Sequence, residues 1–317
     1  MNNLSLTACS IWLREKMPKG KKNEIKIMNL NKKITGNEKE YSDFFELLNN
    51  FCIKHSERFI MNDYEQKMFK IETEKIKIEE NEKFRYTYID INSGGYGIEA
   101  NIVNTKTNKV LYTRKKEHAE TIHFRVFFAV PKGEDVCKGI IIFQNIGQYG
   151  IKTITTDYLR KYINDELNLY TTTGNICPQV FVKKLLDNDG LMKIIYTRNN
   201  VSNDKADTDS MGYGKEERII AGFSNVKKWK EKISGYFNGT SRIYEFEDID
   251  YSGVKFVTSI YGRTRTININ NINNLSIIEG IPDEVVNAFG DIDDKKLKKH
   301  FIEVTKEYLE HMVYNKI

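Results

Sequence analysis

Apolar and polar residues alternate with a period of two over much of residues 66–130, and this pattern limits the folds open to the chain. The clearest apolar positions are Phe84, Tyr86, Tyr88, Phe124, Val126, Phe128 and Val130. Successive side chains of a strand point to opposite faces of a sheet, so such runs bury one face and expose the other. The pattern predicts an antiparallel meander. Within it, Ser93-Gly94-Gly95 predicts a tight turn between two strands.

The segments on either side of the meander have other periods. The pattern predicts short strands over 5–13 and 23–30, a helix over 38–54, a doubly buried strand over 139–144, a helix over 155–166, a strand over 167–170, a helix over 178–187 and a strand over 191–196. Thr155 or Thr156 is the expected N-cap of the second of these helices. The section after Pro131 is therefore expected to be mixed α/β.

The last third of the chain follows a polar stretch, residues 198–216, which is the expected linker or mobile loop. Beyond it the pattern predicts strands over 218–223, 242–247, 253–261 and 264–269, and a terminal helix over 293–314. The apolar stripe of that helix is Leu297, Phe301, Val304, Tyr308 and Met312. We therefore expect an α+β fold with a β-rich domain over 1–200 and a smaller C-terminal lobe over 201–317.

Composition indicates a folded protein with a modest positive charge. Hydrophobic residues make up 40% of the 317 residues, and Lys and Arg outnumber Asp and Glu by 49 to 44. Residues 1–40 hold nine basic and four acidic side chains, which accounts for the net charge of +5. A basic end on a neutral body favours an anionic partner, although Lys-rich surfaces are also ordinary.

The chain lacks the cysteine spacing of a zinc knuckle or a redox pair. Cys9, Cys52, Cys137 and Cys177 all lie far apart in sequence. No apolar run approaches the roughly 20 residues of a membrane span. We therefore expect a cytoplasmic protein with reduced thiols and no membrane partner.

Common catalytic motifs are missing from the sequence. It contains no phosphate-binding loop of the form GxxxxGK[ST], no GxGxxG fingerprint and no GxSxG elbow, so no cofactor, metal or catalytic residue is expected. A metal-dependent nuclease with a divergent site stays open as an alternative, because Glu24-Ile25-Lys26 and Glu65-Gln66-Lys67 match a Glu-x-Lys fragment. Such fragments also arise by chance in a chain rich in Glu and Lys.

Four basic clusters favour nucleic-acid binding. Their members are Arg263 and Arg265; Lys227, Lys228, Trp229 and Lys230; Arg114, Lys115 and Lys116; and Lys19, Lys21 and Lys22. In an extended strand Arg263 and Arg265 would share one face and could contact successive phosphates. An aromatic ring among lysines suits backbone contact with stacking. The alternatives are four unrelated solvated patches and a Trp229 that anchors a core.

The segment Phe143-Gln144-Asn145-Ile146-Gly147-Gln148-Tyr149-Gly150 follows the most buried strand and precedes a helix. Loops at this place in α/β proteins often hold ligands. The segment is equally compatible with a tight structural crossover, and the sequence does not decide between the two.

The layout over about residues 60–310, a long meander followed by KGIIIFQNIGQYGIKTITTDYLRKYI and a separate C-terminal lobe, resembles bacterial anti-phage accessory proteins. These are the Kiwa-type DNA-binding subunit and, more remotely, the RexA-type phage-exclusion protein. The resemblance implies a dimeric DNA-binding protein of phage defence, acting beside a second defence protein. It transfers no site residue. A non-enzymatic interaction module or inhibitor that uses the C-terminal stripe is the remaining alternative.

Overall fold

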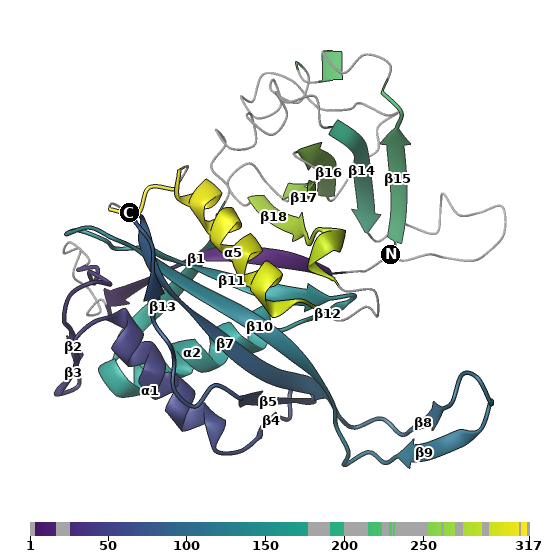
Figure 1. Ribbon diagram of the computed structural model, residues 1–317, viewed down its shortest axis with the longest axis horizontal. Coiled ribbons are helices and arrows are strands. Elements are labelled where there is room, and N and C mark those ends of the chain that lie inside the picture. The colour runs from purple at the N-terminus through teal and green to yellow at the C-terminus, as the bar shows by residue number, and fades with distance from the viewer. Residues whose placement is uncertain are drawn as a thin grey trace. The chain divides into compact units, whose positions relative to one another are not determined.

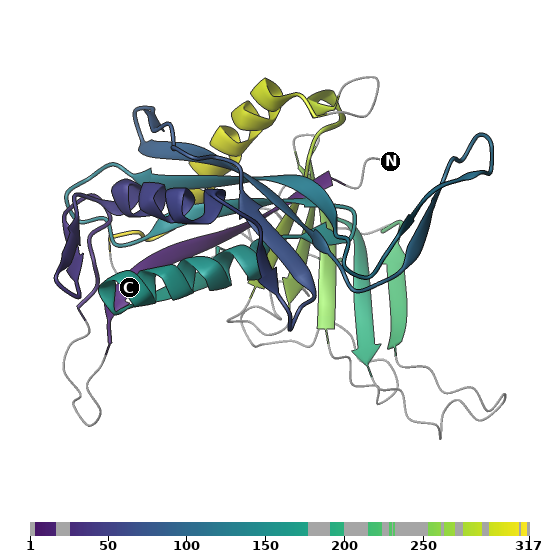
Figure 2. The same ribbon diagram turned by 90° about the horizontal axis from the view of Figure 1, so that it is seen from below.

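The strand-rich pattern of the sequence corresponds to a largely antiparallel structure (Figure 1; a second view in Figure 2). The computed structural model describes residues 4–16, 26–176, 191–199, 215–223, 228–229, 231, 253–260, 263–269, 275–286, 292–310 and 312–315. Within them the protein is mostly antiparallel sheet with three α-helices, which confirms the expected α+β class. None of these helices is long and apolar enough to cross a lipid bilayer.

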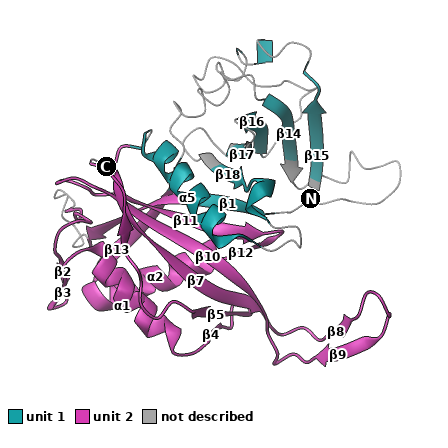
Figure 3. Cartoon of the chain, in the orientation of Figure 1, with its two compact units in different colours: residues 1–8, 175–312 teal, residues 9–174, 313–317 magenta. Residues whose placement is uncertain are grey.

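The chain divides into two compact units (Figure 3). Unit 1 comprises Met1–Ala8 and Asn175–Met312, and unit 2 comprises Cys9–Gly174 and Val313–Ile317. The division falls after Gly174, earlier than the boundary expected after residue 200. The reason is that β14 (Leu191–Asn199) pairs with β15 (Lys215–Ala221) on one side and with β16 (Gly253–Ile260) on the other.

Unit 2 is built on a sheet with the strand order β1-β11-β10-β7-β5-β4. Its strands are β1 (Leu4–Glu15, from Cys9 onward), β4 (Ile60–Asn62), β5 (Lys67–Ile71), β7 (Phe84–Gly95), β10 (Glu120–Pro131) and β11 (Gly139–Ile146). Shorter strands pair with these: β6 (Glu79–Glu80) with β7, β12 (Tyr149–Gly150) with β11, and β13 (Leu169–Asn175) with β1. Two hairpins stand apart, β2 (Ile34–Gly36) with β3 (Lys39–Tyr41), and β8 (Ala100–Val103) with β9 (Val110–Arg114).

Ser93-Gly94-Gly95 lies inside β7 and does not form the predicted turn. Gly94 pairs with Thr121 of β10 and with Met68 of β5. A Cβ atom at Gly94 would lie only 1.6 Å from the carbonyl oxygen of Glu120. Glycine is needed here for the close approach of two backbones and not for a turn conformation.

Two helices cover one face of this sheet. Helix α1 (Phe44–Ser56) begins at Asp43, whose side chain accepts a hydrogen bond from the backbone N–H of Glu46. Helix α2 (Lys152–Leu167) begins after Ile151, without a side-chain cap. Both helices share one buried cluster with the sheet; members include Phe45, Leu48 and Phe51 of α1, Leu159 and Ile163 of α2, and Val126, Phe128 and Phe143 of the sheet. The expected N-cap at Thr155 or Thr156 is wrong, because both lie within α2 and are buried.

Unit 1 contains a sheet with the order β15-β14-β16-β17-β18-β1, to which β1 contributes its first residues. The strands not yet given are β17 (Arg263–Ile269) and β18 (Leu275–Gly280), followed by a 3-10 turn η2 (Asp283–Val285) and helix α5 (Asp294–Leu309). Four of the five predicted stripe residues of α5 are buried, and Met312, beyond its end, is half-buried. The expected helix over 178–187, strand over 242–247 and most of the linker over 198–216 lie outside the described residues.

Candidate nucleic-acid interface

Much of the predicted basic surface lies outside the described residues. This holds for Lys19, Lys21, Lys22, Lys227 and Lys230, and for the side chain of Arg263, whose backbone lies in β17.

Of the cluster formed by Lys227, Lys228, Trp229 and Lys230, the structure describes Lys228 and Trp229. Lys228 is exposed, and Trp229 is half-buried with its ring centroid 5.2 Å from that of Phe223 in an edge-to-face arrangement. This contact agrees with the alternative that Trp229 anchors local packing.

Arg265 corrects the expectation of two exposed arginines on one strand. Its side chain is only 1% exposed. The Nε group donates a hydrogen bond to Glu279 Oε2 at 2.9 Å, and Nη1 donates one to Glu307 Oε1 at 3.1 Å. Because its guanidinium is enclosed and held by two carboxylates, Arg265 does not present a free cation to a phosphate. The alternation placed Arg265 on one face of β17, but it did not show that this face is covered.

The Arg114-Lys115-Lys116 cluster lies at the base of a free-standing β-ribbon. The ribbon consists of β8 and β9 and continues the β7–β10 pair, from whose ends it extends in both views (Figures 1 and 2). The junction bends at Gly97, which has a φ of +90° and donates its N–H to the carbonyl of Lys116 at 2.8 Å. Glycine adopts this backbone conformation at little cost.

The tip of the ribbon is an ordered turn with two lysines. Asn104 Oδ1 accepts hydrogen bonds from the backbone N–H groups of Lys106 and Thr107 at 2.9 and 3.0 Å. The Asn104 N–H in turn donates to the carbonyl of Lys109 at 2.9 Å, which closes the loop. Asparagine is favoured here because its side chain can bond to the backbone two residues ahead. The turn holds Lys106 and Lys109 at the exposed end of the ribbon.

The ribbon exposes apolar as well as basic side chains. Ile102 and Tyr112 form a cross-strand pair, and Val110, Leu111 and Tyr112 are 55%, 65% and 50% exposed. Residues 97–118 contain five basic and two acidic side chains. Within the described part of the chain, the lysines at 106, 109, 115 and 116 form no ion pair and no side-chain hydrogen bond. The surface thus combines unpaired cations with exposed apolar and aromatic groups.

At the base of the ribbon, the side chains of Arg114 and Tyr112 are held by contacts with neighbouring residues. Arg114 Nη1 lies 3.2 Å from Glu120 Oε2, and the Arg114 side chain is 14% exposed. Tyr112 stacks on His118, with ring centroids 5.7 Å apart, and the Tyr112 hydroxyl hydrogen-bonds to His118 Nδ1. The sequence reasoning missed Lys106, Lys109 and Tyr112. The Asn-rich turn between two short alternating runs is the signal that would have pointed to them.

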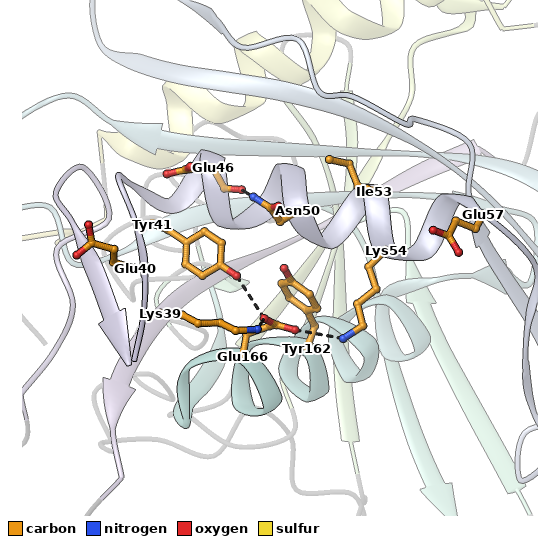
Figure 4. Close-up of a pocket in the computed structure, with 10 residues that line it drawn as sticks. All are labelled: Lys39, Glu40, Tyr41, Glu46, Asn50, Ile53, Lys54, Glu57, Tyr162 and Glu166. Atoms are coloured by element: carbon orange, nitrogen blue, oxygen red, sulfur yellow. Dashed lines mark hydrogen bonds and ion pairs between the residues drawn. The ribbon is translucent and has the colours of Figure 1, made fainter. Parts of the chain in front are cut away.

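A separate polar pocket of about 640 Å³ lies between α1, α2 and β3 (Figure 4). Its central group is the Glu166 carboxylate, which accepts hydrogen bonds from Lys39, from Lys54 at 3.2 Å and from the Tyr41 hydroxyl at 3.4 Å. The hydrogen bond from Lys39 lowers the pKa of Glu166, against the effect of burial. Both lysines pair with Glu166, so this arrangement joins the helices to the β2–β3 hairpin.

The Glu-x-Lys fragment Glu65-Gln66-Lys67 forms an ion pair of 3.2 Å between its own ends. Among the described residues, no three His, Cys, Asp or Glu side chains converge in a way that could hold a metal ion. Glu24 lies outside the described residues. The nuclease alternative therefore gains no support from the described geometry.

The segment over 143–150 forms a tight hairpin between β11 and β12, with Gly147 at a φ of +60°. Its residues Gln148, Tyr149 and Gly150 also line a second pocket of about 340 Å³. No protein-family model matches the chain, and a comparison with curated proteins also finds no match.

Proposed function

We propose that the protein binds nucleic acid, and duplex DNA in particular, through the β8–β9 ribbon. The observation that carries the proposal is the joint placement of unpaired lysines at the tip and at the base of one exposed ribbon. Lys106 and Lys109 lie at the tip, and Lys115 and Lys116 lie at the base. Cations spaced along a ribbon suit the regular line of phosphates of a polyanion.

The form of the ribbon supports a groove-binding role. The major groove of B-DNA is roughly 12 Å wide and admits a two-stranded β-ribbon. A two-stranded hairpin alone in water is marginally stable at best. The exposed Leu111 and Tyr112 are not covered by any part of unit 2 that the structure describes. A bound partner would cover them, and apolar contacts with thymine methyl groups or bases would add to the phosphate contacts.

The test is fluorescence anisotropy with a labelled DNA duplex over a range of salt concentrations. Four phosphate contacts predict a fall in affinity of about 100-fold between roughly 50 and 200 mM salt. Replacing the lysines at 106, 109, 115 and 116 with Gln should weaken binding and reduce the salt slope by about four. Binding that is absent at low salt would overturn the proposal.

A matched control removes the same charge elsewhere. Lys295, Lys296, Lys299 and Lys306 of α5 are also exposed, and their replacement with Gln should leave most of the affinity in place. Equal losses for both variants would show that only net charge matters. A second copy of the chain is the competing occupant. Light scattering would reveal it if Leu111→Gln converted a dimer to a monomer without any change in DNA binding.

We propose phage defence as the setting of this activity, on the strength of the resemblance in layout to anti-phage accessory proteins. The experiment compares plaque counts on bacteria that express the native chain, together with its neighbouring genes, or the four-lysine ribbon variant. Protection that is lost with the ribbon variant is expected. If the native chain and the variant protect equally at equal protein levels, the defence role does not depend on the ribbon.

A further inference from the structure

The pocket of about 340 Å³ in unit 2 has the composition of a small-ligand site. It lies where β7 and β9 end and where β10 and α2 begin, and residues of the β11–β12 hairpin also line it. Ligand pockets typically span about 300 to 1,000 Å³, so this one suits a ligand of modest size. Its lining combines apolar side chains with the charged Lys67, Arg114 and Glu120.

Ser93, a largely buried residue that lines this pocket, has a hydroxyl group without a protein partner among the described residues. Ser93 is 4% exposed, lines the pocket, and has no side-chain hydrogen bond within the described residues. Its neighbours along the wall are Gly94 and Gly95, which contribute no side chains. The Ser93 oxygen is not among the fully buried unpartnered atoms of the described residues, so it is accessible and can form a hydrogen bond with a ligand atom in the pocket.

Two cations line the pocket. Arg114 binds Glu120 through one terminal nitrogen, while its Nε is buried and has no hydrogen-bond partner. Lys67 lies 3.2 Å from Glu65, which does not line the pocket. Glu120 is 67% exposed, so it can turn to solvent when an anion takes its place on Arg114. The lining then offers two positive side chains to an incoming anion.

The N-terminal end of α2 adds a partial positive charge to that of the two cations. Ile151, the residue before α2, lines the pocket; it provides no side-chain cap, and the first turn of the helix contains no acidic residue. The first N–H groups of a helix have no partner within the helix, and the dipole of a 16-residue helix favours an anion at this end.

The rest of the lining suits a planar apolar body. Phe124 is buried, Ile122 packs against the core, Tyr149 is 52% exposed, and all three line the pocket. A flat ring placed between Phe124 and Tyr149 would bury apolar area, while its charged group reached the cations.

We infer that this pocket binds a phosphate monoester that carries a planar ring, the chemistry of a nucleoside monophosphate. The phosphate contacts Arg114, Lys67 and the Ser93 hydroxyl, and the ring lies against the apolar lining residues. The group comes either from a free nucleotide or from the phosphorylated end of a nucleic acid. The inference does not depend on the ribbon, since none of the four ribbon lysines lines the pocket.

The experiment is isothermal titration calorimetry of the full chain with adenosine monophosphate, adenosine, inorganic phosphate and a 5′-phosphorylated oligonucleotide. We expect one molecule of adenosine monophosphate per chain, and affinities for adenosine and for phosphate that are at least about tenfold weaker. An oligonucleotide that binds more tightly than the mononucleotide, and only when phosphorylated, identifies a nucleic-acid end as the source. A mononucleotide that binds more tightly than the oligonucleotide identifies a free nucleotide as the source.

Three variants test the site. Ser93→Ala and Lys67→Met should each weaken binding about tenfold, the loss expected for one hydrogen bond to a charged group. Gly95→Leu should abolish binding by filling the pocket, because a Cβ at Gly95 meets nothing closer than 3.9 Å and the fold tolerates it. Lys70→Met, on the same strand β5 but outside the lining, is the control that leaves binding unchanged.

Two results would overturn the inference. One is no binding of adenosine monophosphate or of the phosphorylated oligonucleotide by a folded native chain. The other is binding that Gly95→Leu leaves intact, or that inorganic phosphate matches. The four-lysine ribbon variant separates this inference from the proposed function, because it should lose duplex binding and keep the affinity for the mononucleotide.

Discussion

Arg265 and Glu279 face each other across β17 and β18 and form an ion pair that is almost completely buried. They are direct partners in the strand register, and each side chain is 1% exposed. Tyr308 of α5 donates a hydrogen bond from its hydroxyl to Glu279 at 2.8 Å, and Glu307 holds the other side of the guanidinium. Burial raises the pKa of Glu279, and Arg265 and Tyr308 oppose that effect. Within unit 1, these ion pairs and this hydrogen bond thus link α5 to the strands β17 and β18.

Arg265→Met should destabilise unit 1 strongly. The change leaves Glu279 buried without its cation, and breaking a buried pair from one side costs about 3–5 kcal/mol. Urea unfolding measures the loss. Lys255→Met is the matched control in the neighbouring strand β16, because Lys255 lies 3.8 Å from Glu217 in a half-exposed pair, and its loss should cost at most about 1 kcal/mol. Equal effects of the two variants would contradict the buried network.

Glu166 should make stability depend on acid pH. Its pKa is lowered in the folded state, chiefly by the hydrogen bond from Lys39, so its contribution is present above the ordinary carboxyl value of 4.5 and is lost as pH falls below it. Glu166→Gln should therefore be less stable than the native chain at neutral pH, and the difference should shrink in acid. Urea unfolding at several pH values tests this. Glu40→Gln, which removes an exposed pair with Lys33, should change little at any pH.

Leu48→Ala in α1 should cost about 2–5 kcal/mol, because Leu48 is fully buried between the helix and the sheet. Ile53→Ala on the same helix is the control. Ile53 is 47% exposed, and the change should stay within about 0.5 kcal/mol. Chemical denaturation of both variants checks the prediction, and a cost at Ile53 as large as that at Leu48 would contradict it.

Gly94→Ala should separate β7 from β10 at the base of the ribbon. The added methyl group would lie 1.6 Å from the Glu120 carbonyl oxygen, so the backbone must shift, at a cost of about 3 kcal/mol. Gly95→Ala, one residue further, meets its nearest atom at 3.9 Å and should be nearly neutral. Amide hydrogen exchange over residues 93–122 would show the local opening. Similar protection in the two variants would argue against the close approach.

Much of the fold could be predicted because its signals are local. The apolar spacing of α1 and the alternation of β10 follow from how a helix or a strand distributes its side chains, and Phe124, Val126, Phe128 and Val130 are buried as the alternation predicts. The intervening Phe127 and Ala129 are buried as well, so the expected solvated face is missing from this part of β10. The doubly buried strand β11 was recognisable for the same reason, as a continuous apolar run. These elements needed no knowledge of their neighbours.

The errors arose where one local pattern permits two structures. Glycine at position 94 signals a turn or a close approach of two backbones, and only the presence of β10 selects the second. Thr155 has the chemistry of an N-cap, but α2 starts three residues earlier, at Lys152. Of the β8–β9 ribbon the sequence singled out only the base, Arg114 to Lys116, because the basic-cluster criterion did not include the isolated Lys106 and Lys109, which the pairing of β8 with β9 brings onto the same ribbon.

The sequence by itself determined the α+β class, the positions of the main helices and strands, and which side of α1 and α5 is apolar, because each depends on the spacing of residues within one segment. Only the tertiary structure decided that Arg265 is enclosed by Glu279 and Glu307 while Lys115 and Lys116 remain exposed. All of these are cations in basic segments, and what separates them is whether a distant strand or helix covers them. Coverage is a property of packing, which the periodicity of a single segment does not encode.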